Sequence, residues 1–432
     1  MEIIRFPEKG KWKEILQRPQ LDASLERRVA EILADIRLNG DEAVRRYSLE
    51  FDKVNIDNFL VTREEMDQGV KEVSPELQKA ICQAKDNIEK FHAGQLDEPA
   101  EIETMPGVKC WRKNVPIDKV GLYIPGGSAP LFSTLLMLGI PARMAGCEEI
   151  ILCTPPDSTG KVHPAILFTA KLVGISQIYK IGGVQAIGAM AFGTASVPAV
   201  YKIFGPGNTF VMHAKELVLM SGVAIDLPAG PSEVAILADQ TCIPSFVAAD
   251  LLSQAEHGPE SQVLLITLDE KIAVAVEQEL ELQLKQLPRK EIAAQALLNS
   301  RAIVMGSLEE ALELINDYAP EHLILCCLQP DQVADKIRNA GSVFLGNYSP
   351  ESAGDYASGT NHTLPTNGFA KVYSGVSQDS FVKKITYQQI SEQGLLQLGS
   401  TIELMAAAEG LEGHSKAVSI RLNYLKKQKR TT

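Results

Sequence analysis

Short apolar runs alternate with longer amphipathic stretches between about residue 119 and residue 345. Each apolar run has the length of a buried strand, and each amphipathic stretch is long enough for a helix of several turns. The apolar runs predict strands at 120–124, 149–153, 177–181, 201–204, 234–237, 263–266, 302–305, 322–325 and 343–345. The intervening stretches predict helices at 130–144, 163–173, 184–192, 208–220, 244–256, 271–285, 308–317 and 331–339. This alternation indicates βαβ units and parallel sheets.

The predicted fold class is α/β, with two incomplete Rossmann-like domains that contain parallel sheets, flanked by helical N-terminal and C-terminal segments. A boundary between the two domains is expected near the Pro/Gly segment 227–231. The amphipathic runs from Leu21 through Leu49 and from Ser74 to His92 predict helices near the N-terminus. The expected division is 1–108 mainly helical, 109–232 first Rossmann-like domain, 233–380 second Rossmann-like domain and 381–432 helical. Ligands of such sheets are expected outside the carboxyl ends of the strands.

Composition and charge exclude several classes of protein. The 432 residues are 45% apolar and 22% charged, as in ordinary globular proteins. A net charge of −12 argues against binding to nucleic acid or to an anionic membrane surface. We find no long apolar stretch that would span a membrane and no signal-peptide pattern. The seven cysteines form no CxxC pair, which indicates reduced thiols and a cytoplasmic protein.

Candidate metal ligands are found in the segment that ends the helix predicted at 244–256. Gln254 and His257 are spaced i, i+3, so they lie on one face of a helix and could hold one metal ion. The alternative is a histidine stabilised by the negative end of the helix dipole.

A second candidate is the pair Glu321 and His322, which follows Pro320 at the start of a predicted strand. An adjacent carboxylate and imidazole provide two proton acceptors of different basicity, as a base for an alcohol proton and a base for water require. The alternative is an ordinary surface pair.

Further candidates lie in the polar loop 352–362, with Asp355 and His362, and in the C-terminal helical tail, with Glu409 and His414. The tail segment could equally be a frayed helix end. Gln254, His257, Asp355 and His414 together would supply two nitrogens and two oxygens, a set that fits zinc or another first-row divalent ion. Their spacing in the sequence does not establish that they converge.

Three glycine-containing turns fall between a predicted strand and a helix, at 125–127, 181–183 and 204–208. Such turns can present backbone N–H groups to a pyrophosphate, but they are equally common as plain tight turns. The sequence has neither GxGxxG nor GxxxxGK[ST].

Six motifs, in order and with plausible spacing, make the chain resemble histidinol dehydrogenase over residues 20 to 425. They lie at 120–131, 204–208, 229–233, 254–258, 319–322 and 358–362. The resemblance implies four-electron oxidation of L-histidinol to L-histidine through histidinaldehyde, the last two steps of histidine biosynthesis, with two NAD+ consumed. It also implies a homodimer whose C-terminal segments cross to the partner subunit, with one zinc ion per subunit.

The resemblance further assigns roles to individual residues. The catalytic pair would be Glu321 and His322. Zinc would be held by Gln254, His257 and Asp355 of one subunit and by His414 of the partner subunit. Besides these catalytic and metal-binding residues, the substrate would contact Ser232, His362 and Glu409. NAD would contact Tyr123, Gln185 and Asn208.

The chemistry of the residues agrees with these roles. His322 can accept the hydroxyl proton of an alcohol near neutral pH, and Glu321 is a suitable base for the water that must add to an aldehyde. A bound zinc ion could hold the imidazole and amino nitrogens of the substrate. The alternatives are a related dehydrogenase of another polar primary alcohol, a metallohydrolase that uses Gln254, His257 and Asp355 without nicotinamide, and a non-catalytic binding protein.

Overall fold

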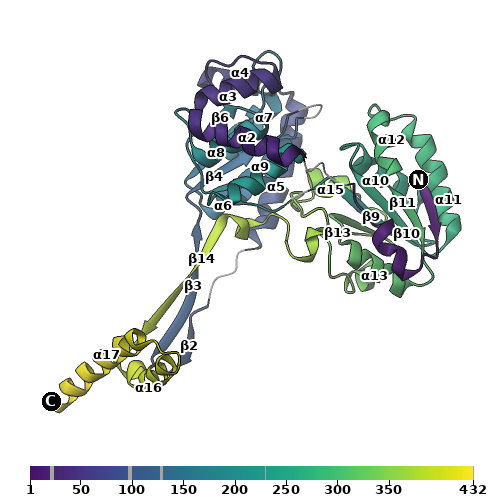
Figure 1. The fold of residues 1–432 in the computed structure, drawn as a ribbon. Helices are drawn as coiled ribbons and strands as arrows, with labels where there is room; N and C mark the ends of the chain where they lie inside the picture. Colours follow the sequence, from purple (N-terminus) through teal and green to yellow (C-terminus); the bar gives the residue numbers. More distant parts are fainter. Residues whose placement is uncertain (20–23, 96–99, 127–129, 229, 432) are drawn as a thin grey trace. The chain divides into compact units, whose positions relative to one another are not determined.

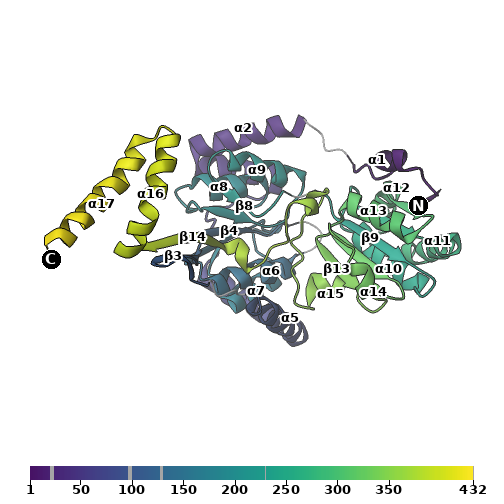
Figure 2. The same ribbon diagram turned by 90° about the horizontal axis from the view of Figure 1, so that it is seen from below.

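The computed structural model describes residues 1–19, 24–95, 100–126, 130–228 and 230–431. The chain forms two compact units, one made of residues 1–95 and 117–381 and the other of residues 96–116 and 382–432. The first unit contains two parallel sheets, each with a hydrophobic core on both faces, under a cover of helices (Figures 1 and 2). The predicted α/β class with two parallel sheets is therefore confirmed.

The first sheet has five parallel strands in the order β6-β5-β4-β7-β8. Its strands are β4 (Lys119–Tyr123), β5 (Glu149–Thr154), β6 (Gln177–Lys180), β7 (Lys202–Phe204) and β8 (Ala224–Ile225). The helices between them are α6 (Phe132–Ala145), α7 (Pro164–Val173), α8 (Gly183–Phe192) and α9 (Thr209–Leu219). The direction of the chain across the sheet reverses between β4 and β7, which is where sheets of this kind open a crevice for ligands.

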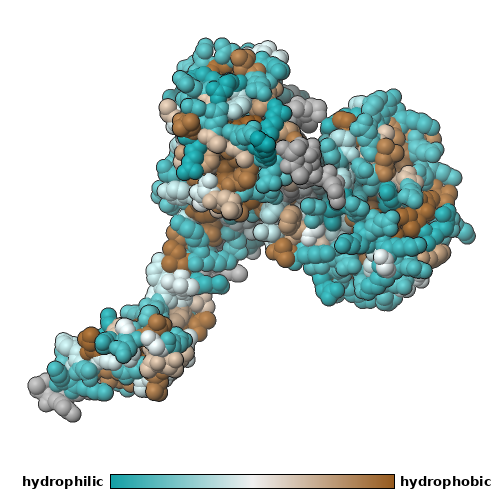
Figure 3. All heavy atoms as spheres, viewed as in Figure 1, coloured by the Kyte–Doolittle hydropathy of each residue, from teal (hydrophilic) through white to brown (hydrophobic). Residues whose placement is uncertain are grey.

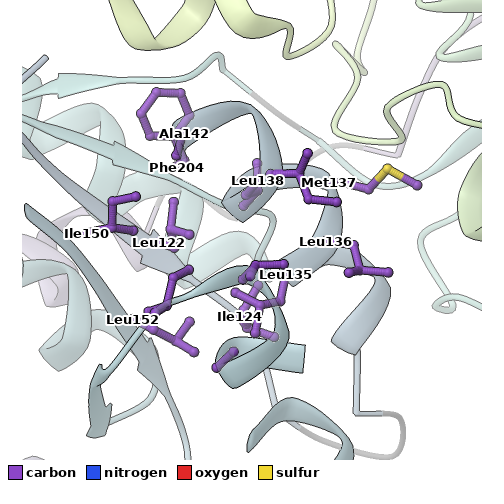
Figure 4. Packing of buried hydrophobic residues seen from close by; sticks show 14 of the residues in the cluster. Leu122, Ile124, Leu135, Leu136, Met137, Leu138, Ala142, Ile150, Leu152 and Phe204 are labelled. Atoms are coloured by element: carbon purple, nitrogen blue, oxygen red, sulfur yellow. The ribbon is translucent and has the colours of Figure 1, made fainter. Parts of the chain in front are cut away.

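The core on one face of this sheet joins β4, β5 and β7 to α6 (Figure 4). Leu122, Leu135, Leu152 and Phe204 are fully buried there. Burial of a side chain of this size contributes about 1.5–3 kcal/mol, so the packing fixes the strand ends that line the cavity described below.

The second sheet has six parallel strands in the order β1-β11-β10-β9-β12-β13. Its strands are β1 (Glu2–Arg5), β9 (Glu233–Ala238), β10 (Gln262–Thr267), β11 (Arg301–Val304), β12 (His322–Cys326) and β13 (Ser342–Leu345). The helices are α10 (Pro244–Ala255), α11 (Glu270–Leu284), α12 (Lys290–Leu298), α13 (Leu308–Tyr318), α14 (Pro330–Ala334) and α15 (Glu351–Tyr356). The sequence did not predict β1, β8, α12 or α15.

The helix predicted at 331–339 is shorter in the structure, because backbone N–H groups near its predicted end donate to the side chain of Asn316. The N–H groups of Arg338 and Asn339 donate to Asn316 Oδ1 at 2.7 and 3.1 Å, so they do not continue the helical ladder of α14.

The helices near the N-terminus are α1 (Trp12–Ile15), α2 (Ser24–Asn39), α3 (Asp41–Tyr47), α4 (Arg63–Glu72) and α5 (Pro75–Ala93). The last four cover the first sheet through contacts with α6, α7, α8 and α9. The run predicted as one helix through Leu49 breaks at Gly40, whose φ of 51° is a conformation that favours glycine. The helix predicted at 74–92 is confirmed as α5.

The second unit contradicts the expectation of a purely helical C-terminal segment. The strand β14 (Val382–Ile390) precedes the helices α16 (Glu392–Ala408) and α17 (Glu412–Thr431). It pairs antiparallel with β3 (Val108–Pro116), which also pairs with β2 (Ile102–Met105). Most side chains of β14 are exposed, so no alternation of buried and exposed positions marks this strand in the sequence.

Three predicted features include residues outside the described part of the chain. They are the start of the first predicted helix at 21–23, the part of the first glycine turn and its motif at 127–129, and Ala229 in the predicted boundary segment. Within the described ranges, no helix has both the length and the apolar character needed to cross a bilayer.

Candidate active site

Glu321 and His322 lie side by side at the amino end of β12, and both are buried. The backbone of Glu233, the first residue of β9, contacts both of them. Its N–H donates to Glu321 Oε2 at 2.8 Å, and its carbonyl oxygen lies 3.2 Å from His322 Nδ1. Gln254 Nε2 donates to the same oxygen of Glu321 at 3.3 Å. The main chain of one central strand thus positions both predicted catalytic groups.

Three carboxylates surround the imidazole of His322. Its Nδ1 lies 3.6 Å from Glu321 Oε2 and 4.0 Å from Glu351 Oε1, and its Nε2 lies 3.5 Å from Asp355 Oδ1. Burial lowers the pKa of His322, but the negative charges of Glu321, Glu351 and Asp355 outweigh it and raise that pKa well above its ordinary value. This arrangement favours a positive charge among the carboxylates.

A group of possible metal ligands adjoins the pair. One ligand atom each from His257, Glu351 and Asp355 lie within 4.8 Å of one another. The Oε1 atom of Gln254, on the last turn of α10, is buried and has no hydrogen-bond partner among the described residues. The structure thus brings His257 and Asp355 together, while Gln254 reaches the pair through Glu321.

Glu351 is a candidate that the sequence reasoning missed. It begins α15, so Glu351 and Asp355 are spaced i, i+4 on one face of a helix. Burial raises the pKa of Glu351 well above its ordinary value, which the charge of His322 opposes. In sequence the segment resembles a polar loop, and for that reason Glu351 was not selected. The spacing of Glu351 and Asp355, four residues apart as on one face of a helix, was the signal that could have revealed it.

Asp355 and His362 are connected directly. The backbone oxygen of Asp355 lies 2.9 Å from His362 Nδ1, while the other ring nitrogen, Nε2, lies 2.9 Å from Thr134 Oγ1 on α6. Burial lowers the pKa of His362, despite the nearby charge of Asp355. Both ring nitrogens are therefore engaged by groups of the protein itself.

A cavity of about 750 Å³ brings five predicted site residues into one space. They are Tyr123, Gln185, Asn208, Ser232 and His257. The cavity lies at the carboxyl ends of strands in the first sheet, as expected. In the second sheet, by contrast, the predicted site residues lie at amino ends of strands, because Ser232 precedes β9 and Glu321 and His322 lie at the start of β12.

The three predicted NAD contacts have partners that fix their orientation. The hydroxyl of Tyr123 accepts a hydrogen bond from the N–H of Gly183 at 3.0 Å. Asn208 caps α9 by accepting from the N–H of Val211 at 3.1 Å. Gln185 is fully buried, with an Oε1 atom that has no partner within the described part of the chain. An unpaired buried acceptor is uncommon in folded proteins, which distinguishes Gln185 among the residues that line the cavity.

Glu409 and His414 belong to the second unit. Glu409 caps the carboxyl end of α16, and His414 lies in the first turn of α17. The cluster in the first unit is built without them, and their predicted roles remain predictions.

Comparison with known proteins gives a consistent result. A model of the histidinol dehydrogenase family matches residues 16–422. The chain is 58% identical over 427 residues to histidinol dehydrogenase from Bacteroides thetaiotaomicron, which covers 99% of this chain and 100% of that protein. It is 51% identical to the enzyme of the same name from Yersinia pestis, over 96% of this chain and 93% of that protein.

A solved structure gives the same indication. The crystal structure of histidinol dehydrogenase from Elizabethkingia anophelis superimposes with a TM-score of 0.96, at 55% identity and over 99% of both chains. With the family match over nearly the whole length, these findings establish that the chain belongs to the histidinol dehydrogenase family.

Proposed function

We propose that this protein oxidises L-histidinol to L-histidine by way of histidinaldehyde, the last two steps of histidine biosynthesis, with zinc and NAD+ as cofactors. One observation carries the proposal: the backbone of Glu233 holds Glu321 and His322 side by side, next to a set of nitrogen and oxygen donors. A base for an alcohol proton and a base for water are the two groups that such a double oxidation needs. Membership of the family supports the same reaction.

Zinc fits the donors that the first unit provides. Gln254 Oε1 and Asp355 Oδ1 are buried without a hydrogen-bond partner among the described residues, and buried oxygens of this kind are costly unless something binds them. Imidazole and carboxylate donors are typical of catalytic zinc, and the amide oxygen of Gln254 would supply a further oxygen donor. We assign the ion to Gln254, His257 and Asp355, together with His414 of the partner subunit. When bound, zinc supplies a Lewis-acidic anchor that orients the nitrogens of the substrate.

NAD+ fits the cavity at the first sheet. The helix α8 begins after Gly182, which has no side chain to cap it. The N–H of Gly183 donates to Tyr123, so Val184 and Gln185 are the first-turn residues whose N–H groups could bind a phosphate. Gln185, whose buried Oε1 has no partner within the described ranges, also lines this cavity. We assign Tyr123, Gln185 and Asn208 to this cofactor, which accepts one hydride in each of the two oxidations.

In the first oxidation, His322 takes the hydroxyl proton of histidinol. Its Nδ1 lies 3.2 Å from the carbonyl oxygen of Glu233, which can only accept a hydrogen bond, so Nδ1 carries the proton. In the neutral ring Nε2 is then the free base, next to Asp355. The carboxylates that raise the pKa of His322 make this neutral ring a stronger base and stabilise the imidazolium that forms when it accepts the proton. Loss of the hydroxyl proton to Nε2 lets the carbon release its hydride and form the aldehyde.

In the second oxidation, Glu321 takes a proton from water. Its Oε2 is occupied by hydrogen bonds from Glu233 and Gln254. Oε1 receives neither bond and is the oxygen that remains to accept the proton as water adds to the aldehyde carbon. The resulting hydrate anion gives up a second hydride to form the carboxylic acid of histidine, which releases its remaining proton to solvent to become the carboxylate.

We propose that a homodimer completes the site. The second unit carries Glu409 and His414, and its two helices expose large apolar side chains that a second copy would cover. Figure 3 shows apolar patches on this unit, where Leu404, Met405, Ile420 and Tyr424 are each at least 60% exposed. Exposed apolar groups of this size commonly mark an interface. We place the enzyme in the cytoplasm, because all seven cysteines are free thiols.

The stoichiometry of NADH tests the reaction. Two NADH should form for each histidinol, and one NADH with released aldehyde would refute the proposal. In a stopped-flow experiment, Glu321→Gln should slow the second NADH more than the first, because only the second oxidation needs water. Glu270→Gln, an exposed glutamate on α11, is the matched control and should leave both phases unchanged.

Mixed dimers test the shared site. His414→Ala and His322→Ala should each be inactive, but a mixture of the two should regain up to about a quarter of wild-type activity, because half of randomly formed dimers contain one complete site. If the mixture stays inactive after dissociation and reassociation of the subunits, His414 does not act across a dimer.

A further inference from the structure

The part of the cavity beside β5 and β6 lacks the acidic residue that usually recognises the adenosine ribose. In dinucleotide-binding sheets, an Asp or Glu after the second strand binds the ribose 2′-hydroxyl, and an Arg there accommodates a 2′-phosphate. Here the second strand, β5, is followed by Pro155 and Pro156, which line the cavity and have no side-chain hydrogen-bonding group. The next acid, Asp157, binds the backbone of Thr159 and Lys161 in its own loop.

Asp52, which is distant in sequence, supplies a carboxylate at this place. It lines the cavity together with Pro155 and Gln185. Its Oδ2 accepts a hydrogen bond from Gln185 Nε2 at 3.0 Å. A Cβ atom on Gly182 would lie 2.6 Å from Pro155 Cβ and 3.3 Å from Asp52 Oδ1, so Asp52 adjoins the glycine turn that starts α8.

The charge around Asp52 disfavours a phosphate at this position. Among the described residues that line the cavity, Arg28 is the one Lys or Arg, and its guanidinium lies 3.6 Å from Glu50 and over the ring of Phe51. Burial raises the pKa of Asp52 from 3.8 to about 6, against the hydrogen bond from Gln185, so the carboxylate is charged above that pH. A 2′-phosphate beside it would meet a like charge, and the described lining residues offer no Lys or Arg other than Arg28, which already contacts Glu50.

We propose that Asp52 is a specificity-determining residue for the cofactor, which accepts hydrogen bonds from the ribose hydroxyls of the adenosine half and rejects a 2′-phosphate. The inference rests on the proposed use of NAD+. Gln185 fixes the carboxylate in place through Oδ2, which leaves Oδ1, on the side of the glycine turn, to receive the hydroxyls. The discrimination between NAD+ and NADP+ therefore resides in a residue from the N-terminal helical segment, outside the strands of the sheet.

The test compares ADP-ribose with 2′-phospho-ADP-ribose by calorimetry, so that it does not depend on turnover. The wild type should bind ADP-ribose more tightly by about 10–100-fold, the size of a charge-assisted hydrogen bond. Asp52→Asn should lose most of this preference, mainly by binding ADP-ribose more weakly and its 2′-phosphate more tightly. Asp67→Asn, which removes an exposed carboxylate on α4 outside the cavity, should keep the wild-type preference.

Two results separate the possibilities. If neither nucleotide binds the wild type, the proposed use of NAD+ fails. If ADP-ribose binds but Asp52→Asn keeps the wild-type preference, the role of Asp52 is overturned. Should Asp52→Asn fail to fold by circular dichroism, Asp52→Ala provides the same comparison, since it also removes the charge.

Discussion

Replacing Arg18 by methionine should destabilise the protein by about 3–4 kcal/mol. Arg18 makes a two-nitrogen contact with the buried carboxylate of Glu233, in which Nη2 lies 2.9 Å from Oε2, and it donates to the backbone oxygen of Tyr318 at 2.7 Å. Its guanidinium also stacks 4.1 Å from the centre of the Tyr318 ring. Methionine keeps much of the aliphatic stem but leaves Glu233 without its cation.

The magnitude follows from the burial of this ion pair. Removing one partner of a buried pair costs about 3–5 kcal/mol, because the other charge stays desolvated. Glu233 retains one donor, the N–H of Asn367 at 2.8 Å, which places the loss toward the lower end of that range. The lost cation–π contact adds about 1 kcal/mol.

The matched control is Arg5→Met. Arg5 also contacts a carboxylate, Glu270, through two nitrogens at 2.8 and 2.7 Å, but these side chains are 50% and 46% exposed. Exposed pairs contribute about 0–1 kcal/mol. The two variants therefore lose a similar arginine–carboxylate contact, which is buried in one case and exposed in the other.

Urea denaturation followed by circular dichroism measures both losses. The deficit of Arg18→Met should be largest near pH 7 and shrink on acidification. Without Arg18, the pKa of Glu233 rises further in the folded state, and protonation then removes the unpaired charge. Adding Glu233→Gln to Arg18→Met should recover part of the stability. Equal losses for Arg18→Met and Arg5→Met at pH 7 would refute the reasoning.

Three further predictions follow from the site. Because the pKa of Asp52 is about 6 in the folded protein and 3.8 is its ordinary value, its carboxylate costs stability as pH rises through that window. Asp52→Asn without cofactor should therefore melt above the wild type at pH 7.5 and lose that advantage at pH 4; an advantage independent of pH would contradict this. His322→Ala should slow hydride transfer about 10²–10⁴-fold in single-turnover experiments, with partial rescue by added imidazole. Asp355→Asn should weaken zinc binding more than tenfold in competition with a chelator, and unchanged affinity would remove Asp355 from the metal site.

The two sheets were predictable because their strands are buried. All nine predicted strands are present, since runs such as 263–266 are apolar on both faces of a covered parallel sheet. The strand β14 escaped prediction because most of its side chains are exposed and its position is set by pairing with β3. One stabilising contact between them is the stacked pair of Trp111 and Tyr387, whose ring centres are 5.6 Å apart. The two residues are far apart in the sequence, so no local pattern predicts this contact.

The candidate site was predictable from its residue types but not from its geometry. Glu321 and His322 attracted attention as adjacent proton acceptors, and Gln254 and His257 as neighbours on a helix. Glu233 could not be identified in this way, because it contacts the pair through its backbone, and backbone groups are the same for every residue type except proline. Asp52 is likewise one acid among many until the fold places it against Gln185.

The strand pairing of the second unit has a consequence for how the protein is made. The residues of β3 leave the ribosome early, yet their partner β14 lies near the end of the chain, with Pro116 opposite Val382. Until synthesis is nearly complete, β3 keeps one open edge, and open edges invite pairing with other chains. Truncation of the nascent chain before β14 should therefore produce an aggregation-prone product. Chaperone binding during translation should concentrate on the hairpin formed by β2 and β3, whose outer edge is still unpaired.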